Sequence, residues 1–183
     1  MSVSMRRQQL SMPNKLARAC WYGVYWLLFR LTPVALHGWR AFVLRCFGAS
    51  IGKRVRVYPS VRIWAPWNLT MADESCIGPG VDCYCVDRIK LQPRAIVSQR
   101  AFLCTATHDY EQPGMPLLTA PITIESDGWV TAEVYVGPGV TLRTGAVALA
   151  RAVVVKDVAA WTVVAGNPAV KVRMRSQPGS VNV

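Results

Sequence analysis

Hydrophobic residues follow two different spacings in the two parts of the chain. Residues 14–47 are rich in Leu, Trp, Phe and Arg, with one break at Thr32-Pro33. Because proline cannot continue the interior of a helix, this segment predicts two helices joined near Pro33. From Ile51 onward, short β-branched pieces alternate with Gly, Pro, Asp and Asn, a pattern typical of strands and turns.

The second part has a six-residue period. Small or aliphatic residues recur in three series, with one step of eight between the first and the second. The series are Ile51, Val57, Ile63 and Leu69; Ile77, Cys83, Ile89, Ala95 and Ala101; and Ile124, Val130, Val136, Leu142, Ala148 and Val154. This interval fits neither an amphipathic helix nor a long alternating strand. It predicts an all-β fold, a parallel β-helix of roughly five or six coils, in which three hexads close one triangular coil.

These patterns divide the chain into four parts. We expect a flexible basic tail at 1–13, a basic and aromatic helical cap at 14–47, the β-helix at 48–168 and a C-terminal tail at 169–183. The period breaks once, between Ala101 and Ile122, where three prolines and a glycine keep residues 108–121 out of the sheet. A loop on a rigid scaffold often carries function, so these residues are the candidate catalytic loop.

Charge is distributed unevenly along the chain. The formal charge of the 183 residues is +11; residues 1–70 contain eleven Lys or Arg and no Asp or Glu, whereas the remainder has ten of each sign. Nucleic acid is disfavoured as a partner, because arginines alternate with Trp, Tyr, Leu and Phe in a helical segment. Such a helix could lie on an anionic membrane surface, pack over the end of the triangular β-helix, or form a contact between subunits. The pattern leaves these three possibilities open.

Neither the cysteines nor the N-terminal region changes this picture. The six cysteines form no C-x-x-C pair, and the two histidines lie outside usual zinc spacings, so we expect no metal and small buried thiols in a reducing cytoplasm. A metal at Cys83 and Cys85, which share one face of a strand, is the alternative. The apolar run at 19–29 is followed at once by Arg30 and no cleavage site, which favours a retained cytoplasmic segment over a signal peptide.

Several segments carry a family resemblance. They are Val57–Leu69, Val81–Tyr84, Val97–Gln99, Leu103–Tyr110, Val136–Val140 and Trp161–Pro168. Together they resemble the hexapeptide-repeat acyltransferases, and more narrowly the colanic-acid biosynthesis O-acetyltransferases, over about residues 14–175. The resemblance implies a left-handed β-helix, a homotrimer with active sites between neighbouring subunits, and acetyl-CoA as donor. It also implies a sugar or lipid-linked oligosaccharide acceptor of exopolysaccharide assembly, and hence a position at the inner face of the membrane.

The chain departs from the family pattern at three turns. Residues 90–94, 124–128 and 147–151 lack the usual glycine-containing turn sequence. Because glycine provides backbone freedom at tight turns, we expect somewhat irregular coils there.

His108 is the candidate general base. Transfer of an acetyl group to a sugar hydroxyl needs a base to take the hydroxyl proton, and imidazole titrates near working pH. The Thr-His-Asp-Tyr sequence at 107–110 matches the family's catalytic-histidine motif, which implies the same role. A structural loop histidine and a nucleophilic Cys104–His108 pair are the alternatives. We expect His37, in the helical cap, to be structural or interfacial.

The resemblance assigns roles to further residues. Trp129 matches an aromatic of the acceptor pocket, with a core or interface tryptophan as the alternative. Tyr84 or Asp87 would orient the acceptor where many relatives use Asn. Ala132 and Ala150 match turns whose backbone groups meet the pantetheine arm, and two ordinary tight turns explain them equally well.

Cations near the end of the repeat domain are candidates for the coenzyme phosphates. Lys156 and Arg173 would bind them, although Val155 stands where relatives usually have Thr. Lys171 is equally explained as surface charge. The rival hypotheses to an O-acetyltransferase are a catalytically silent trimeric β-helix scaffold and a membrane-surface binding module.

Overall fold

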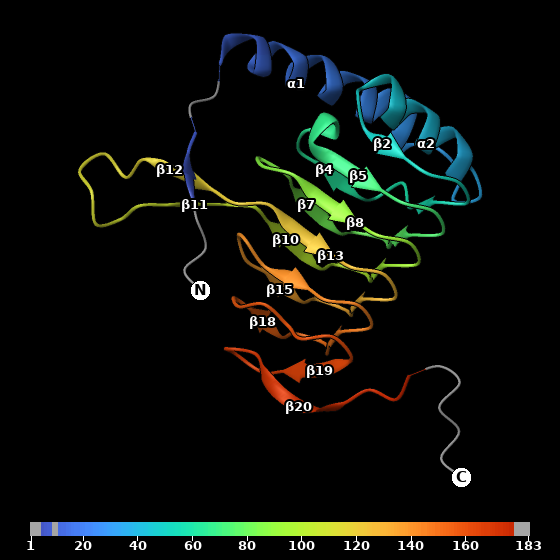
Figure 1. Cartoon of the computed structure of the whole chain (residues 1–183). Helices are drawn as coiled ribbons and strands as arrows, with labels where there is room; N and C mark the ends of the chain where they lie inside the picture. Colours follow the sequence, from blue (N-terminus) through green and yellow to red (C-terminus); the bar gives the residue numbers. More distant parts are fainter. Residues whose placement is uncertain (1–4, 9–10, 178–183) are drawn as a thin grey trace.

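The chain forms a three-sided prism capped by helices at one end (Figure 1). A computed structural model describes residues 5–8 and 11–177. The cap consists of α1 (Met12–Val24), the π-helix η1 (Tyr25–Arg30) and α2 (His37–Cys46). Ser11 caps α1 by accepting a hydrogen bond from the Asn14 amide, and a proline lies in the first turn.

Three parallel sheets form the sides of the prism, and successive strands pass from face 1 to face 2 to face 3. Face 1 holds β2 (Ser50–Ile51), β5 (Leu69–Met71), β8 (Ile89–Leu91), β13 (Ile122–Ile124) and β16 (Thr141–Leu142). Face 2 holds β3 (Arg56–Val57), β6 (Cys76–Ile77), β9 (Ile96–Val97), β14 (Trp129–Val130), β17 (Val147–Ala148) and β19 (Thr162–Ala165), with β20 (Val170–Met174) added antiparallel. Face 3 holds β4 (Arg62–Ile63), β7 (Asp82–Tyr84), β10 (Phe102–Cys104), β15 (Tyr135–Val136) and β18 (Val153–Val154).

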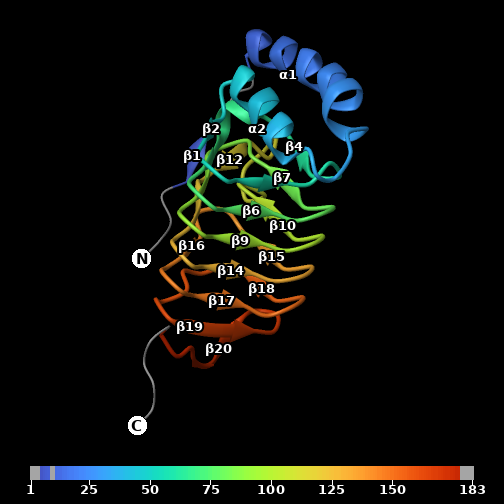
Figure 2. The ribbon, with the colours of Figure 1, turned by 90° about the vertical axis from the view of Figure 1, so that its right-hand side faces the viewer.

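The coil is left-handed, which confirms the fold class expected from the resemblance. In Figure 1, strands β8 and β13 cross the near side from left to right while the chain descends the prism. Figure 2 shows the same stack from another side, with β6, β9, β14 and β17 one below another.

The strand pairing corrects the phase of the repeat. Ile51, Met71, Leu91, Ile124 and Leu142 are in register on face 1. The eight-residue steps therefore run from Ile63 to Met71 and from Cys83 to Leu91, and the step predicted between Leu69 and Ile77 is wrong. The first extra pair of residues is accommodated by the 3-10 turn η2 (Pro66–Asn68).

The sequence was ambiguous here because both phases place buried residues on the inside. Ile89, Ala95 and Ala101 of the predicted series are fully buried, but so are Leu91, Val97 and Leu103, which lie two positions later. Only the inter-strand hydrogen bonds distinguish the two sets.

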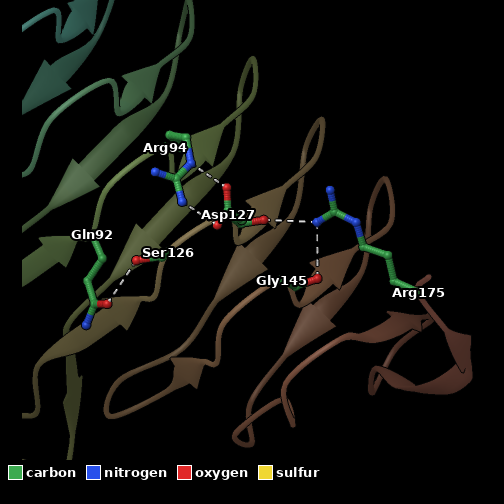
Figure 3. Close-up of polar contacts among 6 residues, drawn as sticks. All are labelled: Gln92, Arg94, Ser126, Asp127, Gly145 and Arg175. Atoms are coloured by element: carbon green, nitrogen blue, oxygen red, sulfur yellow. Dashed lines mark hydrogen bonds and ion pairs between the residues drawn. The ribbon is translucent and has the colours of Figure 1, made fainter. Parts of the chain in front are cut away.

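The expectation of irregular coils is wrong at the three turns that depart from the family pattern. Arg94, Asp127 and Arg151 adopt positive φ angles of 59°, 60° and 63°, at a cost of about 1 kcal/mol each for a residue with a Cβ. Each pairs with a charged residue of a neighbouring coil: Arg94 forms a bidentate ion pair with Asp127 (Figure 3), and Arg151 pairs with Glu133. The strands on either side of these turns keep their parallel register, so the coils remain regular.

The C-terminal segment closes the far end of the prism. The Arg175 guanidinium donates to the carbonyl oxygens of Asp127 and Gly145 at 2.9 and 3.1 Å, joining turns of two successive coils (Figure 3). Residues 170–174, part of the region assigned to a tail, form β20. Residues 178–183 of that region, and residues 1–4 and 9–10 of the N-terminal one, lie outside the described residues.

Two buried side chains, one aromatic and one cationic, donate hydrogen bonds from the helical cap to the prism. Trp21 is buried, donates its indole N–H to the Ile63 carbonyl at 2.7 Å, and packs against Phe29 and Phe47. Arg40 is fully buried; its guanidinium donates to the Val57 carbonyl at 2.7 Å and to the backbone of the segment joining the helices. No helix among residues 5–8 and 11–177 combines the length and apolar character needed to cross a bilayer.

The cysteines are all free thiols, but they do not all lie in the core. Cys76, Cys83, Cys85 and Cys104 are buried as expected, whereas Cys20 and Cys46 on the helices are exposed, so the expectation of buried thiols is wrong for these two. Burial raises the pKa of the Cys85 thiol to about 12.

Candidate active site

The interruption of the repeat forms a hairpin that leaves the prism between face 3 and face 1. Strands β11 (Ala106–His108) and β12 (Leu117–Thr119) pair antiparallel, with His108 opposite Leu117. Strand β1 (Arg6–Arg7) adds to the outer side of β12 and Arg7 contacts Gln112 near the tip, so part of the predicted N-terminal tail belongs to this arm (Figure 1). We refer to β1, β11, β12 and the loop 109–116 as the arm.

His108 lies at the end of β11 with an exposed side chain. Its Nδ1 is 2.6 Å from the Met115 carbonyl oxygen, and the Asp109 amide donates to the Pro116 carbonyl at 3.0 Å across the base of the loop. Because a carbonyl oxygen only accepts, Nδ1 carries the proton and Nε2 of the neutral ring has a free lone pair. The loop thus holds the imidazole in the tautomer that a general base requires.

A buried threonine connects the arm to the strand that precedes it on face 3. The Thr105 hydroxyl donates to the Tyr84 carbonyl at 2.8 Å and accepts from the Asp87 amide at 2.9 Å. Tyr84 and Asp87 are therefore both held at the base of the arm by Thr105, which precedes His108 by three positions in the chain. Sequence reasoning missed Thr105 and Met115, since their roles depend on contacts across the turn and the loop that no local motif signals.

The remaining predicted site residues lie elsewhere on the prism. Trp129 begins β14, is 42% exposed and donates its indole N–H to the Ser98 hydroxyl. Ala132 and Ala150 lie in turns between face 2 and face 3, Lys156 lies in a turn between face 3 and face 1, and Arg173 lies on β20. Ala132 and Ala150 thus lie at a different edge of the prism from the arm, whereas Lys156 lies at the same edge as the arm, two coils further along.

Cys104 and His37 both have structural surroundings. Cys104 is buried, and its thiol donates to the carbonyl oxygen of Ala106, two residues further along the chain, at 3.1 Å. This geometry favours a packing role over a nucleophilic pair with the exposed His108. His37 places Nδ1 2.9 Å from the Val57 carbonyl and packs edge-on against Tyr58, as expected for a structural residue. Among the described residues, no three His, Cys, Asp or Glu side chains cluster as metal ligands would.

The chain is 40% identical over 162 residues to a protein of Escherichia coli (strain K12) named "Putative colanic acid biosynthesis acetyltransferase WcaF", and the match covers 88% of this chain and 89% of that protein. A protein of the same name from Shigella flexneri matches equally. This chain belongs to the colanic acid branch of the hexapeptide-repeat acetyltransferases. The expectation of an acetyltransferase is thereby confirmed, although no protein-family model matches the sequence.

Solved structures of other acetyltransferases have the same fold as this chain. A maltose O-acetyltransferase from Clostridium difficile 630 superposes with a TM-score of 0.85 at 21% identity, covering 96% of this chain and 95% of that one. A hexapeptide-repeat acetyltransferase from Vibrio cholerae has a TM-score of 0.82 at 23% identity, covering 91% and 95%. A second structure of the Vibrio protein, complexed with acetyl-CoA, has a TM-score of 0.79 at 22% identity and covers 91% of each chain.

Proposed function

We propose that this acetyltransferase transfers the acetyl group of acetyl-CoA to a sugar hydroxyl of an exopolysaccharide precursor, with His108 as general base. The observation that carries the proposal is the exposed imidazole whose Nδ1–H is held by the Met115 carbonyl. Support for the donor and the acceptor class comes from the names of the relatives: one is a colanic acid biosynthesis protein, one a maltose O-acetyltransferase, and one was solved with acetyl-CoA.

The reaction needs one proton to move from the sugar hydroxyl to His108 and then from His108 to the thiolate of coenzyme A. Nε2 of His108 takes the proton of the sugar hydroxyl while its oxygen attacks the thioester carbonyl, giving a tetrahedral oxyanion and an imidazolium. Collapse of the intermediate breaks the carbon–sulfur bond, and the imidazolium returns the proton to the departing thiolate. The Met115 carbonyl accepts from Nδ1–H throughout and stabilises the imidazolium when it forms. No acyl-enzyme is required.

We further propose that the site is completed between neighbouring subunits of a homotrimer. His108 extends from the boundary of faces 3 and 1, whereas Ala132 and Ala150 lie at the boundary of faces 2 and 3. Two edges of one convex prism cannot meet, but edges of adjacent prisms can. In this arrangement Trp129 lines the acceptor pocket and the backbone at Ala132 and Ala150 meets the pantetheine arm.

The polar residues complete the proposed site. Tyr84 and Asp87, which are tied to the base of the arm through Thr105, orient the acceptor. Lys156 and Arg173 are exposed cations available to the coenzyme phosphates.

His108→Ala tests the mechanism. Removal of the base is expected to lower the rate of thiol release from acetyl-CoA with an oligosaccharide acceptor by about 10²- to 10⁴-fold, while the affinity for coenzyme A is retained. Glu111→Gln, a change on the same loop, is the matched control and should leave the rate unchanged. Full activity in His108→Ala would refute the mechanism, and absence of any turnover in the wild-type enzyme would favour a silent scaffold.

A second proposal concerns location: the enzyme acts in the cytoplasm, bound at the inner face of an anionic membrane, where a lipid-linked oligosaccharide would be presented. Exposed apolar side chains are concentrated on the helical cap, including Leu16, Leu27, Leu28, Leu31, Val34, Trp39 and Phe42. The cap contains cations and no acidic residue, and apolar plus cationic helical surfaces favour an anionic bilayer interface.

The membrane proposal is tested by vesicle flotation of the full chain. Leu27→Glu combined with Leu31→Glu should reduce flotation with anionic phosphatidylglycerol vesicles several-fold, since two 73–74% exposed apolar contacts are lost and repulsive charges are introduced. Val155→Glu, a change at an exposed apolar residue of the prism, is the control. Equal flotation of all three proteins would exclude the cap as the membrane contact.

A further inference from the structure

A groove lies between the helices α1 and η1 and the end of face 3 that is nearest the helical cap. It has a volume of about 890 Å³, which lies within the range of sites for small organic molecules. Helix α1 and η1 form one wall, and β4 and β7 form the other. Cations and aromatic rings line it, among them Lys15, Arg18, Trp26, Arg30, Trp64 and Tyr84.

The charge of the groove is strongly positive. Its single carboxylate, Asp82, is already paired with Arg62 at 2.6 Å. Among residues 5–8 and 11–177, no carboxylate lies within ion-pair distance of Lys15, Arg18 or Arg30. Three cations therefore face the groove without a carboxylate partner, which is the arrangement that attracts phosphate oxygens.

The aromatic side chains provide flat surfaces beside these cations. Trp64 and Tyr84 pack edge to face with ring centroids 5.6 Å apart, and the Arg18 guanidinium lies 4.1 Å above the Trp64 ring. Tyr22 and Trp26 on the opposite wall are 64% and 49% exposed. Aromatic rings that combine an apolar face with a polar edge suit the apolar C–H faces of sugar rings while leaving hydroxyls to water.

The groove is also close to the proposed base. Tyr84 lines the groove, and its carbonyl accepts the hydrogen bond from Thr105 at the start of the arm. His108 follows three residues later in an extended strand, a separation of roughly 10 Å. A ligand longer than one sugar ring can thus occupy the groove and reach towards the arm.

We propose that this groove binds a phosphate-bearing saccharide and holds the phosphorylated end of the acceptor. The inference rests on the proposed function for its link to His108, but the binding site stands on the groove's own side chains. A free sugar phosphate, a nucleoside diphosphate sugar and a lipid diphosphate-linked sugar share this chemistry. The cations bind the phosphate, and the aromatic walls bind the first sugar.

Tryptophan fluorescence tests the proposal, since Trp26 and Trp64 line the groove. The probes are glucose, inorganic phosphate, glucose 1-phosphate, UDP-glucose and farnesyl diphosphate-linked glucose. At least one phosphorylated sugar should bind about tenfold or more tightly than glucose and than phosphate, because hydrogen bonds to charged groups are the stronger ones. The probe bound most tightly identifies the source of the phosphate. Equal affinity for glucose and every phosphorylated sugar would overturn the proposal, as would phosphate binding as tightly as the sugar phosphates.

Variants separate the phosphate contacts from the sugar contacts, and the groove from the proposed base. Lys15→Gln combined with Arg30→Gln should weaken the phosphorylated sugar about tenfold, and Trp26→Leu should weaken it without changing affinity for phosphate. Arg143→Gln, an exposed cation on the prism, is the control. His108→Ala should bind like the wild type, so failure of the base assignment leaves this result intact. Unchanged affinity in both groove variants would refute the site.

Discussion

At the scale of single residues, the candidate site depends on backbone carbonyls as much as on side chains. The His108 tautomer is set by the Met115 carbonyl, and the position of Tyr84 relative to the arm is set by the Thr105 hydroxyl. The Thr-His-Asp-Tyr motif was sufficient to select His108 from the sequence. It could not indicate Met115, because that partner follows a loop whose path depends on the hairpin closing.

Thr105→Val tests the connection between the arm and face 3. Valine has the same shape but leaves the Asp87 amide and the Tyr84 carbonyl with one partner fewer in a buried site, so the free energy of unfolding should fall by about 2 kcal/mol. Thermal and urea unfolding measure this loss. Thr107→Val, at an exposed position of β11, is the matched control and should change stability little; an equally small effect of both substitutions would show that Thr105 does not hold the arm.

At the scale of elements, charged ladders connect turns of successive coils in which the residue with positive φ is not glycine. Glu133 adopts φ 60° and lies between two arginines of neighbouring coils, Arg151 at 2.6 Å and Arg100 at 2.5 Å. The hydrogen bond from Arg151, followed by that from Arg100, lowers the pKa of Glu133 below its usual 4.5. The sequence showed the missing glycines but not the ladder, because the partners are 18 and 33 residues away along the chain.

Glu133→Gln is expected to lower the Tm at pH 7 by a small amount, as usual for exposed ion pairs. A depressed folded-state pKa stabilises the native state above the unfolded-state pKa, and this contribution is lost as the pH falls through the folded-state value. The Tm difference between wild type and variant should therefore shrink below about pH 4.5 and vanish at lower pH. Thermal melts from pH 7 to pH 3 measure it, with Glu111→Gln as control; a constant difference across that range would contradict the ladder.

At the scale of the whole molecule, one chain carries the candidate site residues on separate edges of the prism. The arm with His108 and the turns with Ala132 and Ala150 lie at different boundaries between faces. The proposed trimer supplies the missing neighbour. The helical cap and its groove lie at one end of the prism, so they can serve each subunit without interfering with the contacts between prisms.

Co-expression of His108→Ala and Trp129→Ala subunits tests this arrangement. Each variant alone should be weakly active or inactive. If the two side chains come from neighbouring subunits, random assembly leaves about a quarter of the interfaces with both intact, and activity returns to that extent. If both belong to one subunit, every site carries a defect and no activity returns. Light scattering on the mixed and single proteins checks that all have the mass of a trimer.

The hexad period by itself determined the β-helix, because three inward side chains must meet at the axis of every coil and only a six-residue repeat supplies them. The motif determined which histidine to examine, and the count of charges separated a basic cap from a neutral prism. The phase of the repeat, the tautomer of His108, the joining of β1 to the arm and the groove beneath α1 were decided only by the tertiary structure. Each of these depends on hydrogen bonds or packing between residues far apart in the chain, and no local pattern encodes which distant partner a residue will have.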